Sequence, residues 1–177
     1  MIETLNKFKK GKRVKKDFHV RQATQDDIQE IGILWVELMD YHAALDPLFK
    51  RSANGRESFE NFVLKNMQGD EHQIIVAVNA NGELIGFCQA GITEYFDVFE
   101  HRTCGYIFDM FVSDKHRREG IGFALYSEAK KWFDEKKITR IELSLFTQNK
   151  ASSAFWQSIG FHTFMERRRL EVAESFY

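Results

Sequence analysis

The chain has 177 residues, enough for one domain with a hydrophobic core, and its 44% hydrophobic and 29% charged residues are typical of a soluble globular protein. No apolar run approaches the roughly 20 residues that a transmembrane helix needs, so we expect no membrane partner. The formal net charge of −1 hides an asymmetry, because residues 1–16 carry a net charge of +6 and the other 161 residues a net charge of −7.

The basic segment over residues 1–16 has neither the apolar core nor the small-residue cleavage site of a secretory signal. One interpretation is an arm that touches nucleic acid, an acidic lipid surface or an acidic partner. We favour a flexible, solvated terminus, because no aromatic platform for stacking bases accompanies the charge. We therefore expect a leader over 1–16, a folded domain over 17–177 and no nucleic-acid partner.

The first half of the chain predicts a strand, two helices and a β-hairpin. Residues 17–23 alternate as a strand, and residues 24–45 repeat apolar side chains at helical spacing. The only proline then marks a break before a second helix over 55–68. Residues 72–95 form the clearest hairpin, with two β-rich runs around an Asn-Gly pair.

The second half of the chain predicts alternating strands and helices. Residues 104–112 are apolar and aromatic, which is typical of a central strand buried on both faces. Residues 118–137 begin with glycines and become an amphipathic helix, and residues 138–146 alternate as a strand. A helix over 149–160 with a C-capping glycine and a last strand over 161–172 complete one α/β domain of order β-α-α-β-β-β-α-β-α-β.

The cysteines and histidines limit the kinds of site that the chain can hold. Cys88 and Cys104 are the only cysteines, and they form no CxxC motif. Two separated thiols suit a reducing compartment, so we expect a cytoplasmic protein. The six histidines are scattered without an HExxH pair, so we expect no protein-bound metal.

The strongest motif is Arg117-x-x-Gly120-x-Gly122, which lies between a predicted strand and a predicted helix. Two residues without a Cβ let a ligand approach the backbone, and the first helical amides are donors of the kind that a pyrophosphate needs. The spacing is not the dinucleotide G-x-G-x-x-G, and no GK[ST] of a P-loop follows. By itself the motif would also fit a tight turn without a ligand.

This stretch resembles the central motif of the GNAT superfamily of N-acyltransferases, Gln/Arg-x-x-Gly-x-Gly/Ala after a strand. A second motif of that superfamily, an Asn, a helix, an aromatic pair and Gly-Phe, is matched by Asn149, Phe155-Trp156 and Gly160-Phe161. The segment "VRQATQDDIQEI" also resembles the start of that fold, and the likeness covers nearly all of the chain after the leader. It implies a mixed, mostly antiparallel sheet flanked by helices.

The resemblance also implies acetyl-CoA as the acyl donor. Its pyrophosphate would lie on the backbone of residues 118–123, and its pantetheine arm would pair with residues 110–112, where the central strand splays from its neighbour. A backbone amide near Val112 would polarise the thioester carbonyl, and Asn149 would bond to the arm or to an ordered water. The expected cofactor-binding residues are Met110, Phe111, Val112, Arg117, Arg118, Glu119, Gly120, Ile121, Gly122, Phe123, Asn149 and Trp156.

Trp156 stands where the superfamily often has a tyrosine that gives a proton to the departing CoA thiolate. An indole N–H donates a hydrogen bond but does not ionise usefully, so Trp156 could contact the sulfur without being a general acid. The reaction need not stop, because a thiol pKa of about 8.5 makes the thiolate a fair leaving group. The alternative is that Trp156 is a core aromatic residue beside Phe155.

Two carboxylates are candidate bases. Asp109 lies in the apolar strand, where a carboxylate is expected to be functional or to be paired with a nearby Lys, Arg or backbone amide, and we favour the pairing. Glu142 lies on the same strand face as Ser144, and Ser144 stands five residues before Asn149. A water chain could also serve. The tentative catalytic residues are therefore Asp109, Glu142 and Trp156.

The acceptor pocket, by resemblance, is built by the first two helices and the loop after the third strand. We predict that acetyl-CoA and a primary amine of a small molecule or peptide react there by direct attack. The alternative is a non-catalytic acyl-CoA-binding sensor or partner module, in which Trp156 marks lost catalysis. Homodimers are common in the superfamily. The expected substrate-binding residues, which would give the pocket an anionic rim, are Tyr41, His42, Asp46, Glu94 and Tyr95.

Overall fold

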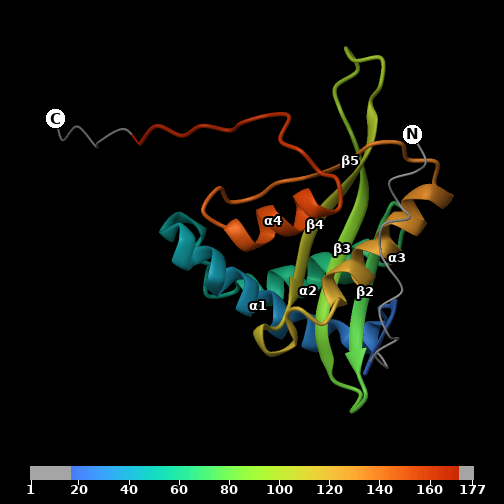
Figure 1. Ribbon diagram of the computed structural model, residues 1–177, viewed down its shortest axis with the longest axis vertical. Coiled ribbons are helices and arrows are strands. Elements are labelled where there is room, and N and C mark those ends of the chain that lie inside the picture. Colours follow the sequence, from blue (N-terminus) through green and yellow to red (C-terminus); the bar gives the residue numbers. More distant parts are fainter. Residues whose placement is uncertain (1–16, 172–177) are drawn as a thin grey trace. The chain divides into compact units, whose positions relative to one another are not determined.

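A computed structural model describes residues 17–171, so the basic leader lies outside the described residues (Figure 1). The described chain forms two compact units, one up to Ser144 and one from Leu145 onward. The helices and strands of the first unit are β1 (Phe18–Gln22), α1 (Ile28–Leu45), α2 (Gly55–Asn66), β2 (His72–Asn79), β3 (Leu84–Glu94), β4 (Thr103–Val112), α3 (Ile121–Glu135) and β5 (Ile141–Leu143).

The sheet of the first unit has the strand order β1-β2-β3-β4-β5. The first four strands pair antiparallel, and β5 alone runs parallel to its neighbour, β4. The predicted mixed, mostly antiparallel sheet is confirmed. The hairpin between β2 and β3 turns at Gly82, whose φ of +87° is a conformation that favours glycine.

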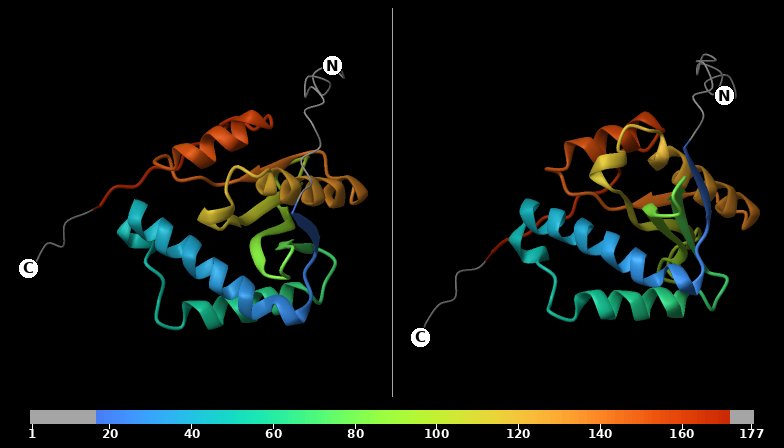
Figure 2. Two further views of the ribbon diagram at one scale, coloured as in Figure 1. Left: turned by 60° about the horizontal axis from the view of Figure 1, so that its bottom comes forward. Right: turned by 90° about the horizontal axis from the view of Figure 1, so that it is seen from below.

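The α1–α2 face of the sheet carries the larger apolar cluster. Alternation along the strands places Val76 of β2, Phe87 of β3 and Phe111 of β4 on this face. They pack against buried residues of α1 and α2 such as Leu38 and Phe59. Figure 2 shows these two helices on one side of the sheet and α3 on the other.

The α3 face is packed closely enough to exclude a side chain at Gly105 of β4. A Cβ there would lie 2.6 Å from Phe133 of α3, whereas a Cβ on Gly86 of β3 would meet the backbone carbonyl of Phe111 at 2.7 Å. The buried side chains of α3 recur at helical spacing, as its sequence predicts. β4 lies between β3 and β5, and its residues Cys104, Gly105, Ile107 and Phe111 are buried, whereas Phe108 is exposed, so burial on both faces is only partly as predicted.

The second unit contains one helix, α4 (Lys150–Ser158). The Asn149 side chain caps its start, because Asn149 Oδ1 accepts a hydrogen bond from the amide of Ser152 at 3.0 Å. Gly160, at φ +106°, follows its end, as predicted, and the amide of Phe161 donates to the carbonyl of Trp156 at 3.0 Å.

Two sequence predictions about strands are wrong. The strand predicted over 138–146 is formed only over Ile141–Leu143, and the last predicted strand is absent from the described residues, which end at 171. Residues 161–171 alternate like a strand but form no ladder, and their charges pair locally, as Arg168 does with Glu166 at 2.7 Å. Alternation reports strand propensity, whereas a strand also needs a neighbouring strand to satisfy its backbone.

Candidate active site

The loop between β4 and α3 presents unpaired backbone amides. A short 3₁₀ helix (Asp114–His116) follows β4, and Arg118 and Gly120 then adopt left-handed φ angles of +69° and +84°. Gly120 precedes α3 without a side-chain cap, so the amides of residues 121–123 have no hydrogen-bond partner within residues 17–171. A helix start of this kind favours an anion.

Gly120 keeps that helix start open. A Cβ built on it would meet no atom within 4 Å, so the backbone faces open space. Its left-handed conformation is also one that other residues rarely adopt. Arg118 and Glu119 beside it are exposed. The structure thus gives the motif the shape that an anionic ligand requires.

Arg117, the first residue of the motif, ties this loop to β4 and α1. Its Nε donates a hydrogen bond to the carbonyl of Val112 at 3.3 Å. Its guanidinium carbon lies 5.8 Å from the ring centroids of both Tyr41 and Phe111. Arg117 therefore positions the end of β4 relative to the loop.

β4 has two halves that differ in their pairing. The ladder with β5 covers only three positions and ends where Ile107 pairs with Leu143. Residues 108–112 continue as a strand, and among residues 17–171 they pair only with β3. The predicted divergence of the central strand is therefore present in the first unit. It includes Met110 and Val112, whose backbone was predicted to meet the pantetheine arm.

A β-bulge lies where β4 leaves β5. Gln89 of β3 pairs with Asp109, but the next residue, Ala90, pairs with Ile107, so Phe108 is the extra residue. In a bulge, two residues of one strand face one residue of the other, here Phe108 and Asp109 facing Gln89. Bulges re-aim side chains and are frequent beside active sites.

Asp109 is a half-buried carboxyl without a partner. It forms no hydrogen bond or ion pair with any residue that the structure describes, so the interpretation that a Lys, Arg or backbone amide neutralises it finds no support there. Burial raises its pKa from the ordinary 3.8 to about 6. It would therefore be ionised at neutral pH but close to its titration point, which suits a general base.

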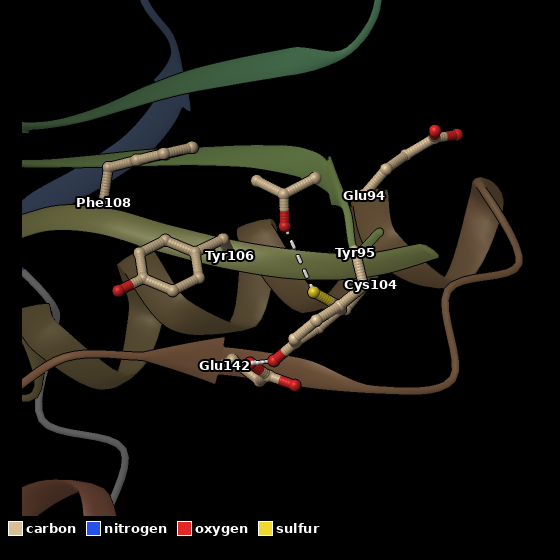
Figure 3. Close-up of a pocket in the computed structure, with 7 residues that line it drawn as sticks. Glu94, Tyr95, Cys104, Tyr106, Phe108 and Glu142 are labelled. Atoms are coloured by element: carbon tan, nitrogen blue, oxygen red, sulfur yellow. Dashed lines mark hydrogen bonds between the residues drawn. The ribbon is translucent and has the colours of Figure 1, made fainter. Parts of the chain in front are cut away.

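A cavity of about 280 Å³ opens beside the bulge (Figure 3). Phe108 is shared between the bulge and the cavity wall, and its ring lies 5.1 Å from that of Tyr106. The wall is largely aromatic and also holds two carboxylates. The lining residues are Thr93, Glu94, Tyr95, Cys104, Tyr106, Phe108 and Glu142.

Glu142, the second candidate base, is already engaged. The hydroxyl of Tyr95 donates to Glu142 Oε2 at 2.6 Å, and Arg140 Nε lies 3.1 Å from Glu142 Oε1 (Figure 3). The hydrogen bond to Glu142 raises the pKa of the Tyr95 hydroxyl. Glu94, at the rim, pairs with Arg102 at 2.8 Å. The carboxylates of this cavity are thus paired, unlike Asp109.

The other predicted substrate-binding residues do not line this cavity. Tyr41 lies beside Arg117 of the loop between β4 and α3. His42 is half-buried at the end of α1, and burial lowers its pKa. Asp46 accepts a hydrogen bond from the amide of Leu48 at 3.1 Å and so caps a short 3₁₀ helix. Of the five predicted residues, Glu94 and Tyr95 line this cavity, whereas Tyr41, His42 and Asp46 lie together at the end of α1, where the Asp46 amide donates to the His42 carbonyl at 2.9 Å.

Trp156 is buried within the second unit. Its ring makes edge-on contacts with Phe155 and Phe161, with centroids 5.0 and 5.1 Å away. These contacts agree with the alternative of a core aromatic residue, and a role of Trp156 at the CoA sulfur stays a prediction. Asn149, the other predicted site residue of this unit, caps α4.

Sequence reasoning missed Gln89 and four residues of the cavity wall. Alternation along residues 104–112 could have placed Cys104 and Tyr106 on one face. The position of Phe108 depends on the bulge, which only the pairing of β3 with β4 reveals.

Within residues 17–171 no group of three or more His, Cys, Asp or Glu side chains could hold a metal ion. No helix in that range is long and apolar enough to cross a membrane.

The fold and the loop are those of an N-acyltransferase, and residues 35–161 match the sequence profile of the acetyltransferase (GNAT) family. The chain therefore belongs to the acetyltransferase (GNAT) family. An uncharacterised N-acetyltransferase of Archaeoglobus fulgidus is 26% identical over 139 residues, which are 78% of this chain and 89% of that protein.

Solved structures share the fold. The tetramutant of a Bacillus halodurans protein superposes with a TM-score of 0.77 and 19% identity over 87% of this chain and 99% of that one. An aminoglycoside N-acetyltransferase, solved in complex with CoA, superposes with a TM-score of 0.68 and 18% identity over 88% of this chain and 95% of that one.

Proposed function

We propose that this protein transfers an acetyl group from acetyl-CoA to a primary amine of a small molecule or peptide. The observation that carries the proposal is the place of Asp109, a half-buried carboxyl without a partner in the described chain, at the bulge where β4 leaves β5. The anion-binding loop lies at one end of this half-strand, and the aromatic cavity adjoins the bulge at its other end.

The donor would be held by backbone groups. The unpaired amides of residues 121–123 and the open backbone at Gly120 suit a pyrophosphate. The unpaired edge of β4 over residues 108–112 suits an amide-bearing arm that adds to the sheet as a strand would. The CoA complex of an acetyltransferase with the same fold supports this assignment.

Asp109 would act as the base. The amine nitrogen attacks the thioester carbonyl carbon, a C–N bond forms, the C–S bond breaks, and the thiolate leaves with the bonding electron pair. The amine proton passes to Asp109, whose pKa of about 6 leaves it ionised near neutral pH. A backbone amide near Val112 would stabilise the oxyanion. Glu142 is a weaker candidate, because Tyr95 and Arg140 already occupy its oxygens.

The cavity would receive the acceptor. Its volume of about 280 Å³ admits a small molecule or one extended side chain. Rings of Tyr106 and Phe108 at the wall suit an ammonium group, whereas the Tyr95 ring and the Glu142 carboxylate already contact Arg140. Aminoglycosides are acceptors named for structural neighbours, and they are amines of this general kind.

The first test is thiol release from acetyl-CoA with a broad panel of primary amines. Turnover with any of them supports the proposal, and its initial rate identifies the preferred acceptor class. Tight binding of CoA without turnover across polyamines, amino acids, aminoglycosides and peptides would instead favour the acyl-CoA-binding module.

The donor site is tested by Gly120→Asp, which adds a carboxylate where the pyrophosphate would lie. At an effective dielectric of about 20, a like charge about 4 Å away costs about 4 kcal/mol, so we expect CoA affinity to fall by about 100-fold or more in calorimetry. Gly82→Asp is the matched control, because Gly82 also has a left-handed φ and open space. Unchanged affinity in Gly120→Asp, or equal losses in both variants, would show that the phosphate site lies elsewhere.

A further inference from the structure

Gln89 is a fully buried glutamine in the middle of β3, and its relative exposure is 0%. Neither its side-chain oxygen nor its side-chain nitrogen has a hydrogen-bond partner within residues 17–171. A buried amide is normally paired, because it loses its hydrogen bonds to water on folding. An apolar side chain would fill the same space without this penalty, so packing alone does not explain a glutamine here.

The group that Gln89 faces is Asp109. The two residues are directly paired across β3 and β4, and the bulge at Phe108 lies at this point. Side chains paired in this way leave the sheet on the same face with Cβ atoms about 4.5–5.5 Å apart. A buried amide without a partner thus lies opposite a half-buried carboxyl that also has none in the described chain.

The two residues are not equally accessible. Asp109 retains some exposure beside the cavity wall, whereas Gln89 is enclosed between β2 and the α1–α2 cluster. Gln89 is therefore shielded from solvent, whereas Asp109 is only partly shielded. A glutamine amide carries two N–H donors, and an ionised carboxylate is the strongest acceptor available in this part of the face.

No other titratable group near Asp109 takes that role. His72 of β2 contacts Phe108, Cys88 of β3 lies in the strand beside Gln89, and Glu142 of β5 is paired. His42 lies at the end of α1, and Arg117 is engaged with Val112 and two rings. Burial raises the pKa of Asp109, and the charge of Asp109 in turn contributes, after burial, to raising the pKa of the Cys88 thiol.

We propose that Gln89 is a positioning residue that donates a side-chain N–H to the Asp109 carboxylate in its ionised, proton-accepting state. This role rests on the proposed function of Asp109 as the base. The amide would fix one carboxylate oxygen and leave the other directed at the acceptor amine. A donor that binds only the ionised form favours that form, so its removal should make Asp109 harder to ionise.

The test is the titration of Asp109 by carboxyl-carbon NMR in wild type and Gln89→Met, which keeps the volume and removes the donor. We expect the pKa of Asp109 to be higher in Gln89→Met than in wild type by about one unit, because the variant keeps the burial and lacks the donor. Gln73→Met is the matched control, because Gln73 pairs with Ala90 in the same sheet and its side chain leaves the opposite face. An Asp109 titration unchanged in folded Gln89→Met would overturn the proposal.

A second variant covers the case in which Gln89→Met does not fold. Gln89→Glu places a carboxyl opposite Asp109, and we expect the pair to titrate in two coupled steps, one of them above the wild-type value. Two independent titrations near ordinary carboxyl values would contradict the facing arrangement.

The kinetic readout separates this proposal from the proposed function. With an amine that turns over, Gln89→Met should shift the acid limb of the pH profile of kcat/KM to higher pH, by the same amount as the NMR titration. The KM for acetyl-CoA should stay unchanged. An NMR shift without turnover by any amine would support the Gln89–Asp109 contact and overturn the role of Asp109 as a base. A lowered rate without any shift of the limb would overturn the positioning role.

Discussion

Asp27 and Asp109 are both carboxyls removed from water, and their surroundings give them opposite properties. Arg21 binds Asp27 through two hydrogen bonds of 2.6 and 2.8 Å, and the amide of Thr24 donates a third at 2.7 Å. These bonds, led by those from Arg21, lower the pKa of Asp27 to about 2. Asp109 has no such partner in the described chain, and burial raises its pKa to about 6. Burial alone therefore does not show whether a carboxylate is structural or reactive; its partners do.

The difference follows from where each residue lies in the fold. Asp27 ends the short turn before α1, so its partners lie three and six residues back along the chain. Asp109 lies at a bulge between strands that are distant in sequence. A local turn readily provides donors, whereas the bulge interrupts the strand pairing and leaves Asp109, next to the cavity-lining Phe108, without a donor in residues 17–171.

The largest effect that would separate the two carboxyls is on the rate. Asp109→Asn removes the base and should lower kcat by about 10²–10⁴-fold, because that is the usual worth of positioned proton transfer. The wild-type rate should fall as the pH drops through about 6, and this limb should vanish in the variant. Thiol release between pH 5 and 9 measures both. CoA affinity is the control and should not change; a near-normal rate would point to a water chain as the base.

The second effect is on stability and concerns Asp27. Asp27→Asn should lower the free energy of unfolding by about 2 kcal/mol at pH 7. This figure follows from the difference between the pKa of Asp27 in the folded state, about 2, and its ordinary value of 3.8. The folded-state pKa is depressed, so this stabilisation is present above about pH 4 and is lost as the pH falls towards 2. Urea unfolding at pH 7 and pH 2.5 tests it. Equal losses at both pH values would mean that charge is not the cause.

The third effect has the opposite sign. The pKa of Asp109 is raised in the folded state, so its ionisation destabilises the fold. This destabilisation is small at pH 4 and reaches its full size above about pH 6. Asp109→Asn should therefore raise the free energy of unfolding by about 1–2 kcal/mol at pH 8, with a smaller gain near pH 4. Thermal unfolding at the two pH values measures this. A loss of stability at pH 8 would show that Asp109 stabilises the fold as Asp27 does.

The smallest effect concerns Trp156, which is buried like the two carboxyls but has ring contacts as its partners. Trp156→Phe removes the indole N–H and some packing, and it should lower the free energy of unfolding by about 1 kcal/mol or slightly more. We expect kcat to stay within about threefold of wild type, since a packing role touches no reacting atom. A tenfold or greater loss of kcat at unchanged stability would assign the indole N–H to the chemistry.

The parts of the site that were predictable depend on short segments. The turn at Gly120 and the helix start after it could be predicted because both are specified by adjacent residues. The cap at Asn149 and the stop at Gly160 follow from the same local chemistry, although the cap itself was not foreseen. Asp109 could be singled out because a charge in an apolar strand is unusual.

The parts that were not predictable depend on pairing between distant segments. The bulge at Phe108 and the position of Gln89 opposite Asp109 require the register of β3 with β4. The last strand was wrongly predicted because alternation over 161–172 says nothing about a partner. The cavity also draws its wall from three strands, β3, β4 and β5.

The sequence by itself determined the class of protein, the sheet-and-helix order up to α4 and the loop suited to an anion, because these depend on periodicity, turn chemistry and motif spacing. The tertiary structure decided which carboxyl is paired and which has no partner in residues 17–171. It paired Glu142 with Tyr95 and Arg140, and it placed the buried Gln89 opposite Asp109 in the register of β3 with β4. Those outcomes follow from which strands lie side by side and where one of them bulges, and neither is encoded in any one stretch of the chain.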